Sequence, residues 1–175
     1  KRQRLVDLGG ATGHLALAAA QAYPGMQTAV FDLPPVVETA AEFTKGVAVE
    51  LIGGDFFTDP LPLADLYAVG RILHDWSEAK IVTLLRKIYA ALPAGGALLI
   101  AEKLLLPDKS GPVSALMQSL NMLVCTEGKE RTLAEYEELL RDAGFGIVEG
   151  MCTGKPVDAL LARKLDDVFQ LSEGL

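Results

Sequence analysis

Several residue types that would mark particular protein classes are scarce in this chain of 175 residues. It holds only two cysteines, Cys125 and Cys152, which lie far apart in sequence and form neither a disulfide framework nor a metal-ligand spacing. Positive charge is in deficit: the formal net charge is −7, whereas a nucleic-acid-binding surface requires an excess of Lys and Arg. No apolar run reaches the roughly 18 residues of a membrane span. We therefore expect a cytoplasmic protein that binds no nucleic acid, no metal and no membrane.

Other signals that are missing concern the start of the chain. There is no initiator Met and no signal-peptide pattern, and KRQRLVDLGG leads almost at once into an apolar run. We expect that a longer protein continues upstream of Lys1. Half of the residues present are hydrophobic, and a chain of this length can bury a sizeable core, which predicts one globular domain.

Apolar runs bounded by turn residues alternate with amphipathic segments along the chain. The pattern predicts strands at 4–8, 27–31, 47–52, 66–73, 97–102, 145–151 and 157–162, and helices at 13–23, 34–43, 77–92, 113–124 and 132–141. The alternation is typical of an α/β domain with a mainly parallel sheet. The last two strands are joined by the loop CTGKP, which is too short for a crossover helix, so at least one of them is antiparallel. The tail, 165–175, is expected to be a terminal helix or disordered.

A glycine-rich turn, LVDLGGATG, follows the first predicted strand. Glycines at this place in a doubly wound sheet let the backbone approach a nucleotide closely, although they can also simply form a tight turn. From Gly9 to Gly13 the spacing is Gly-x-Ala-x-Gly. It differs from the Gly-x-Gly-x-x-Gly fingerprint of dinucleotide binding, which disfavours an NAD-dependent reductase.

Acidic and aromatic residues stand at the ends of the next two predicted strands. Asp32, in VFDLP, can accept hydrogen bonds from both hydroxyls of a ribose. In GGDFF, Asp55 and Phe56 can hold an adenine by its amino group and its face. The alternatives are a capped turn for Asp55 and core packing for Phe56. Because three consecutive strand ends carry such groups, the set favours a ligand site.

Five motifs, in order, resemble a known family. LVDLGGATG, VFDLP, GGDFF, RILHDW and EGKERT are similar to the class I S-adenosylmethionine-dependent O-methyltransferases of the plant caffeate and flavonoid type. SLNMLVCTEGKERT is similar to the acetylserotonin (hydroxyindole) branch and its methyltransferase-like paralogue. The resemblance covers residues 4–164. It implies a Rossmann-like, doubly wound seven-stranded methyltransferase sheet, mainly parallel with an antiparallel last strand. It also implies a catalytic domain at 1–164, a tail at 165–175 and an N-terminal dimerisation domain outside this chain.

The resemblance further implies transfer of a methyl group from S-adenosyl-L-methionine to a hydroxyl of a small aromatic substrate, leaving S-adenosyl-L-homocysteine, in a homodimer of the full-length protein. It assigns the cofactor to Asp7, Gly9, Gly10, Asp32, Leu33, Gly54, Asp55, Phe56 and Arg71, and the substrate to Asp75, Trp76, Asn121 and Cys125. Two positions depart from the family. Ala11 stands where relatives usually have glycine, and Cys125 stands where the hydroxyindole enzyme uses glutamine, which removes an amide from the pocket.

His74, one of only two histidines, ends the apolar run at 66–73 and is the candidate general base. A neutral imidazole, with an ordinary pKa near ~6.5, is a suitable proton acceptor at pH 7. A lone histidine is more often bonded to a neighbouring carbonyl, but HDW matches the base motif of the family. Glu102 and Glu130 are the candidate carboxylates for its other ring nitrogen. The alternatives are a solvated strand end for Glu102 and a helix N-terminal acid for Glu130. GKERT is a distinctive string, which favours Glu130.

Two alternatives remain open at this stage. The helix at 113–124 would line the acceptor pocket, or it is an ordinary core helix that buries Leu116, Leu120 and Leu123. The domain is an active enzyme, or it is a methyltransferase-like module of a larger fusion protein that binds the cofactor with little or no turnover. The intact set His74, Glu102 and Glu130 favours the enzyme.

Overall fold

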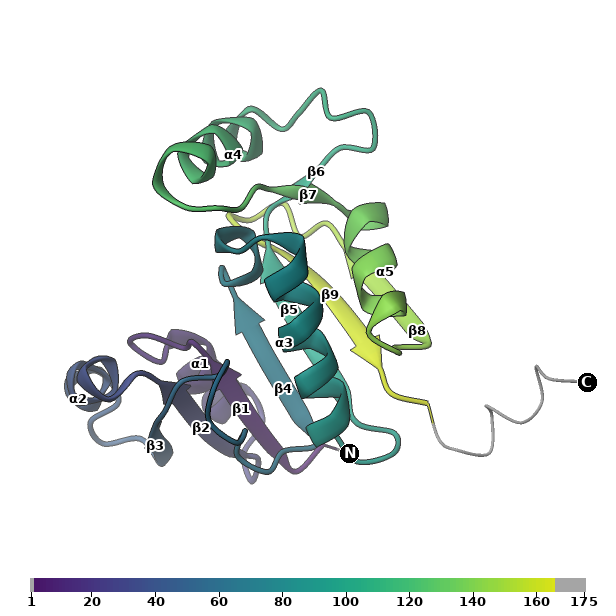
Figure 1. Ribbon diagram of the computed structural model, residues 1–175. Coiled ribbons are helices and arrows are strands. Elements are labelled where there is room, and N and C mark those ends of the chain that lie inside the picture. Colours follow the sequence, from purple (N-terminus) through teal and green to yellow (C-terminus); the bar gives the residue numbers. More distant parts are fainter. Residues whose placement is uncertain (1, 166–175) are drawn as a thin grey trace, which may run out of the picture.

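Seven strands form one sheet in the computed structural model, which describes residues 2–165 (Figure 1). The strands are β1 (Arg4–Leu8), β2 (Gln27–Asp32), β3 (Val49–Gly53), β4 (Leu66–Gly70), β5 (Ala97–Glu102), β8 (Ile147–Met151) and β9 (Asp158–Arg163). Their order is β3-β2-β1-β4-β5-β9-β8. From β3 to β5 all neighbours are parallel, whereas β9 is antiparallel to both β5 and β8. The fold class predicted from the sequence is confirmed.

The helices follow the apolar periodicity of the sequence. They are α1 (His14–Ala22), α2 (Pro34–Phe43), α3 (Glu78–Ala91), α4 (Val113–Cys125) and α5 (Leu133–Asp142). The buried positions of α3 are Ile81, Leu84, Leu85 and Ile88, which is the spacing of a single helix face. α3 and α5 lie side by side on one face of the sheet, where they enclose the main core with β4, β5 and β9 (Figure 1).

The opposite face of the sheet is less completely covered in the described part of the chain. Along β9, buried residues such as Leu160 alternate with half-buried ones such as Leu161. Leu66, Leu99 and Leu161 form the floor of an open apolar groove beside α1. The two faces therefore differ, one being packed under helices and the other partly open.

The fourth strand is shorter than predicted. The apolar run suggested a strand through Leu73, but β4 ends at Gly70 because Arg71 adopts a left-handed backbone conformation, with φ +56°. The next residues form a single 3₁₀ turn, η1 (Leu73–Asp75). The N–H groups of Ile72 and Leu73 bond to a carboxylate of β5 instead of extending the sheet. His74 therefore lies on this 3₁₀ turn and not in the strand.

The remaining differences are small. Most element ends agree with the predictions to within two residues. Two short strands, β6 (Leu104–Leu105) and β7 (Arg131–Thr132), pair in parallel and were not predicted. Ser77 occupies the N-cap position of α3, but its side chain makes no capping hydrogen bond. Among the helices between residues 2 and 165, none combines the length and apolarity that a membrane crossing requires. Apart from Leu165, the predicted tail lies outside the described residues.

Candidate functional site

The turn after β1 depends on left-handed backbone conformations. Gly9 has φ +68° and Gly13 has φ +80°, values that glycine adopts without steric penalty. Ala11 also lies in this region, with φ +47°, which explains why a glycine would suit the position. The N–H of Ala11 donates to Asp32 Oδ2 at 2.9 Å, and this bond helps to hold the strained residue in place.

Asp32 joins the turns that follow β1 and β2. Besides the bond from Ala11, its Oδ1 accepts a hydrogen bond from the N–H of Leu33 at 2.8 Å. Its carbonyl accepts the N–H of Gly54 at 2.9 Å, which adds the end of β3 to the same group. A carboxylate has about four lone-pair sites, so both oxygens can still accept further donors. The three strand ends that the sequence singled out are thus brought together.

Asp7 lies beneath this turn as a buried carboxylate. A Cβ atom added at Gly10 would lie 2.7 Å from Asp7 Oδ2, so a side chain at Gly10 would be overcrowded. Burial raises the pKa of Asp7 to about 7, and the nearby charge of Asp32 adds to that effect. Asp7 therefore supports the turn from below, in contact with its backbone.

The GGDFF segment combines the predicted ligand residues with the structural alternatives. Asp55 Oδ1 accepts the N–H of Phe57 at 2.8 Å, which caps a turn. Phe56 packs partly against the core, and its ring edge lies against the backbone of Gly9. Asp55 retains free lone pairs and Phe56 stays partly exposed, so both remain able to meet a ligand.

His74 is buried on η1, and its Nδ1 lies 2.8 Å from Glu130 Oε1. This geometry suits the tautomer in which Nδ1–H donates to the carboxylate and Nε2 keeps a free lone pair. Asp75 Oδ1 lies 3.6 Å from Nε2. Burial lowers the pKa of His74, but the hydrogen bond to Glu130 and the charges of Glu102, Glu130 and Asp75 raise it, and the net pKa is above its ordinary value.

Glu102 stands at the end of β5 and is fully buried. Its Oε1 accepts hydrogen bonds from the N–H groups of Ile72 at 3.0 Å and Leu73 at 2.9 Å, while its Oε2 lies 3.5 Å from His74 Nδ1. Burial raises the pKa of Glu102 to about 7, and Glu130 raises it further, while His74 and the two N–H groups oppose the rise. Glu130 is thus the direct partner of His74, and Glu102 holds the turn that carries it.

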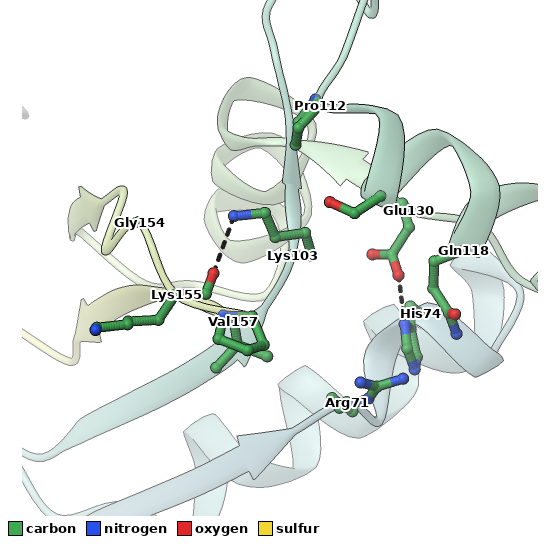
Figure 2. A pocket seen from close by; sticks show the side chains of 11 residues that line it. Arg71, His74, Lys103, Pro112, Gln118, Glu130, Gly154, Lys155 and Val157 are labelled. Carbon is green, nitrogen blue, oxygen red and sulfur yellow. Dashed lines mark hydrogen bonds and ion pairs between the residues drawn. The ribbon is translucent and has the colours of Figure 1, made fainter.

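A cavity of about 510 Å³ opens beside His74 and Glu130 (Figure 2). The sequence prediction included three of its residues, Arg71, His74 and Glu130. It missed the polar side chains of Lys103, Ser114, Gln118 and Lys155. Lys103 was detectable in principle, because it directly follows Glu102 at a strand end. Its ammonium group pairs with Asp158 at 3.0 Å and donates to the carbonyl of Lys155 at 3.3 Å.

None of the residues predicted to bind substrate, Asp75, Trp76, Asn121 and Cys125, lines this cavity. Trp76 packs edge to face against Phe57 at 5.0 Å. Asn121 and Cys125 lie one turn apart on α4, with Cys125 Sγ donating to Asn121 Oδ1 at 3.6 Å, and both are exposed. The core-helix alternative for α4 is wrong, because only Ala115 and Met122 of that helix are buried.

The ligating atoms of His74, Glu102 and Glu130 all lie within 4.8 Å of one another, a spacing that a divalent cation could bridge. However, Nδ1 already bonds to Glu130, and Glu102 Oε1 already accepts two N–H groups. These contacts describe a histidine that is hydrogen-bonded to one carboxylate and a second carboxylate that is bonded to the backbone.

Comparison with known proteins identifies relatives along most of the chain. A family model of the O-methyltransferase domain matches residues 1–146. Acetylserotonin O-methyltransferase of Bos taurus is 50% identical over 163 residues, which cover 91% of this chain and 47% of that protein. A Homo sapiens protein named probable bifunctional dTTP/UTP pyrophosphatase/methyltransferase is 48% identical over 163 residues, which cover 91% of this chain and 26% of that protein. The chain thus spans about half the length of the first relative and about a quarter of the second.

Solved structures that resemble this chain are also methyltransferases. The crystal structure of human N-acetylserotonin methyltransferase in complex with S-adenosylmethionine superposes with a TM-score of 0.91 at 46% identity, covering 94% of this chain and 48% of that one. An O-methyltransferase family 2 protein from Planctomyces limnophilus, in complex with apigenin, gives a TM-score of 0.88 at 33% identity, covering 94% of this chain and 51% of that one.

Proposed function

The chain belongs to the O-methyltransferase family, and from this premise we propose that the longer protein carrying it transfers the methyl group of S-adenosylmethionine to a hydroxyl of a small aromatic acceptor. The names of its relatives favour a hydroxyindole within that class. The observation that carries the proposal is the buried hydrogen bond of 2.8 Å between His74 and Glu130 at the edge of an open cavity.

The turns after β1, β2 and β3 fit a nucleoside-containing cofactor. The free lone pairs of Asp32 are what the hydroxyls of a ribose require, and glycines at 9 and 10 leave the backbone of the turn without side chains. The residues proposed to hold the cofactor are Asp7, Gly9, Gly10, Asp32, Leu33, Gly54, Asp55, Phe56 and Arg71. When bound, S-adenosylmethionine supplies an electrophilic methyl group.

The chain's own contribution is to position the acceptor and remove its proton. With Nδ1–H donated to Glu130, Nε2 of His74 accepts the hydroxyl proton as the oxygen attacks. Glu130 then stabilises the imidazolium, as the carboxylate of a catalytic triad does. Glu102 keeps the turn in place, and Asp75, Trp76, Asn121 and Cys125 are proposed to contact the acceptor. Because only the neutral imidazole accepts a proton, activity should rise with pH through the raised pKa of His74.

The decisive experiment changes His74 to Ala in the protein that carries this chain. General-base catalysis typically contributes about 10²–10⁴-fold, so kcat should fall by that factor while the affinity for S-adenosylhomocysteine stays nearly unchanged. A methyl-transfer assay on a panel of hydroxyindoles and phenols, paired with calorimetry, measures both quantities. Near-normal turnover of the variant would mean that the HDW motif is only structural.

A second candidate is a methyltransferase-like module that binds the cofactor without turnover. It is favoured by the 48% identity to a relative described as a probable bifunctional protein. Under this alternative, S-adenosylhomocysteine stabilises the protein that carries this chain, by roughly 2.7 kcal/mol at a hundred times its Kd, but that protein methylates no acceptor of the panel. Stabilisation by NAD instead would contradict both candidates.

The proposal also includes a homodimer of the longer protein and a cytoplasmic location. The low number of cysteines supports the location.

A further inference from the structure

We propose that Arg131, together with Gly128, is a positioning residue that holds Glu130 against the imidazole of His74. The inference rests on the proposed role of His74 as the base. It concerns a residue that touches neither the cavity nor the imidazole, and that acts through the backbone on both sides of the pair.

The first observation is where the guanidinium of Arg131 donates its hydrogen bonds. One Nη atom donates to the carbonyls of Lys129 at 3.0 Å and Leu73 at 3.4 Å, and the other donates to the carbonyl of Trp76 at 3.4 Å. Leu73 and Trp76 flank His74, and Lys129 directly precedes Glu130. A single side chain therefore ties the turn that carries the base to the segment that carries its carboxylate.

The second observation is that this charge is deeply buried without a carboxylate partner. Arg131 is only 1% exposed, and no carboxylate of residues 2–165 lies within 4 Å of its guanidinium as an ion pair. Burying a cation is expensive unless its donors are satisfied. Here backbone carbonyls accept hydrogen bonds from both Nη atoms, whereas Nε is buried without a partner. The cation therefore depends on these carbonyls, and it is most stable when both segments are correctly placed. The planar fork of arginine can span the two segments, whereas a lysine ammonium is a single point.

The third observation is the close approach of the two backbones. A Cβ atom added at Gly128 would overlap the carbonyl oxygen of His74 and would lie 2.7 Å from the carbonyl carbon of Asp75. Only glycine lets the segment before Glu130 lie directly on the turn. The backbone of Arg131 also pairs with Leu104, two residues beyond Glu102. Gly128 sets the distance between the segments, and Arg131 sets their register.

The test uses the fact that the chain contains only two histidines. His14 is exposed at the start of α1, far in sequence from Gly128 and Arg131, so its imidazole serves as an internal reference in a ¹⁵N spectrum. In the wild-type chain His74 should show the Nδ1–H tautomer. Arg131→Lys, which keeps the charge but loses the fork, should mix the tautomers and lower the pKa of His74, as Glu130→Gln does more strongly. His14 should not change in any variant.

Turnover gives a second readout. In the protein that carries this chain, Arg131→Lys should lower kcat by about 10- to 100-fold, the usual effect of a small misplacement, with KM changed less than threefold. If His74→Ala keeps full turnover, the proposed function fails, yet the tautomer measurement still decides the role of Arg131. An unchanged His74 tautomer and pKa in a folded Arg131→Lys chain would overturn the proposed positioning role of Arg131.

A measurement on the wild type keeps the proposal testable if the variants do not fold. Nη protons held by three carbonyls should give separate, exchange-protected signals, with nuclear Overhauser contacts to the backbone of Leu73 and Lys129. Freely rotating, rapidly exchanging Nη protons would overturn the proposal without any substitution.

Discussion

Asp32 combines two tasks that a substitution can separate. Its carboxylate holds the strained turn at Ala11, and it is proposed to bind the ribose hydroxyls. Asp32→Ala should weaken the binding of S-adenosylhomocysteine by roughly 1.5–3 kcal/mol, the scale of a charge-assisted hydrogen bond. Isothermal calorimetry on the chain measures the change.

Asp65 offers a matched control for Asp32. Its two oxygens also accept backbone N–H groups, from Gln3 at 2.8 Å and Arg4 at 2.9 Å, but at the opposite end of β1. Asp65→Ala should lower stability without changing the affinity for S-adenosylhomocysteine. Equal affinities for the two variants would remove Asp32 from the cofactor site.

Two buried carboxyl groups make stability depend on pH. Their pKa values in the folded chain, about 7 for both Asp7 and Glu102, lie above the ordinary values of about 4, so folding favours the protonated forms. The stability that this contributes is fully present below about pH 4 and is lost as pH rises through about 7. In Asp7→Asn, the free energy of unfolding should fall less as pH rises, by an amount on the order of 1–4 kcal/mol, because position 7 no longer titrates. Urea unfolding between pH 5 and 8, without cofactor, measures the slope, and identical slopes for both chains would contradict the expectation.

At the level of elements, α3 and α5 begin differently although both have a hydroxyl residue at the N-cap. Thr132 forms a complete capping box with Glu135, whereas Ser77 makes no side-chain bond. Thr132→Ala should therefore lower the free energy of unfolding by about 0.5–2 kcal/mol, and Ser77→Ala by less than about 0.5 kcal/mol. Chemical denaturation of the two variants compares them directly. A larger loss from Ser77→Ala would show that the capping geometry is not what stabilises these helices.

Periodicity and turn residues were sufficient to predict most elements. Val113–Cys125 and Pro34–Phe43 were recognised because apolar spacing and proline positions are local properties. The end of β4 was not predicted, because the sequence stays apolar through Leu73. The turn that ends the strand depends on the backbone of Arg71 and on Glu102, about 30 residues away. The pairing of β6 with β7 involves two residues on each side, too few to produce a pattern.

The candidate site shows the same division. Glu130 was favoured as the partner of His74 from a distinctive string, and the structure places it at hydrogen-bond distance. Lys155 and Gln118 were missed because they reach the cavity from a loop and a helix without any motif. The place of Arg131 was also hidden, because its partners are backbone carbonyls, which leave no trace in a sequence.

At the scale of the whole molecule, α4 presents an exposed apolar stripe. Its members recur at helical spacing and include Val113, Met117, Leu120, Leu123 and Val124, of which Leu123 is 73% and Val124 78% exposed. Such a surface tends to find a partner, and a second copy of the chain carries the same stripe. We expect the 175-residue chain to self-associate through residues 112–126, to bind S-adenosylmethionine weakly and to transfer methyl groups negligibly.

Sedimentation velocity, combined with a radiolabelled methyl-transfer assay, tests this expectation. Leu123→Lys should shift the chain towards monomer, whereas Leu63→Lys, at a loop residue that is 83% exposed, should not. Association that persists in Leu123→Lys would point instead to the open groove at Leu99 and Leu161. A wild-type monomer with robust turnover would show that this chain alone holds the whole site.

Trp76 is the only tryptophan of the chain, and it lies two residues after His74. Its ring meets Phe57 edge to face, the ammonium group of Lys80 lies 4.7 Å from its centroid, and its carbonyl accepts a bond from Arg131. Indole emission responds to nearby charge and to solvent. Intrinsic fluorescence excited selectively at tryptophan therefore reports only on the surroundings of Trp76. The packing around His74 can be followed optically during refolding or titration, separately from the circular dichroism of the helices, with no label added.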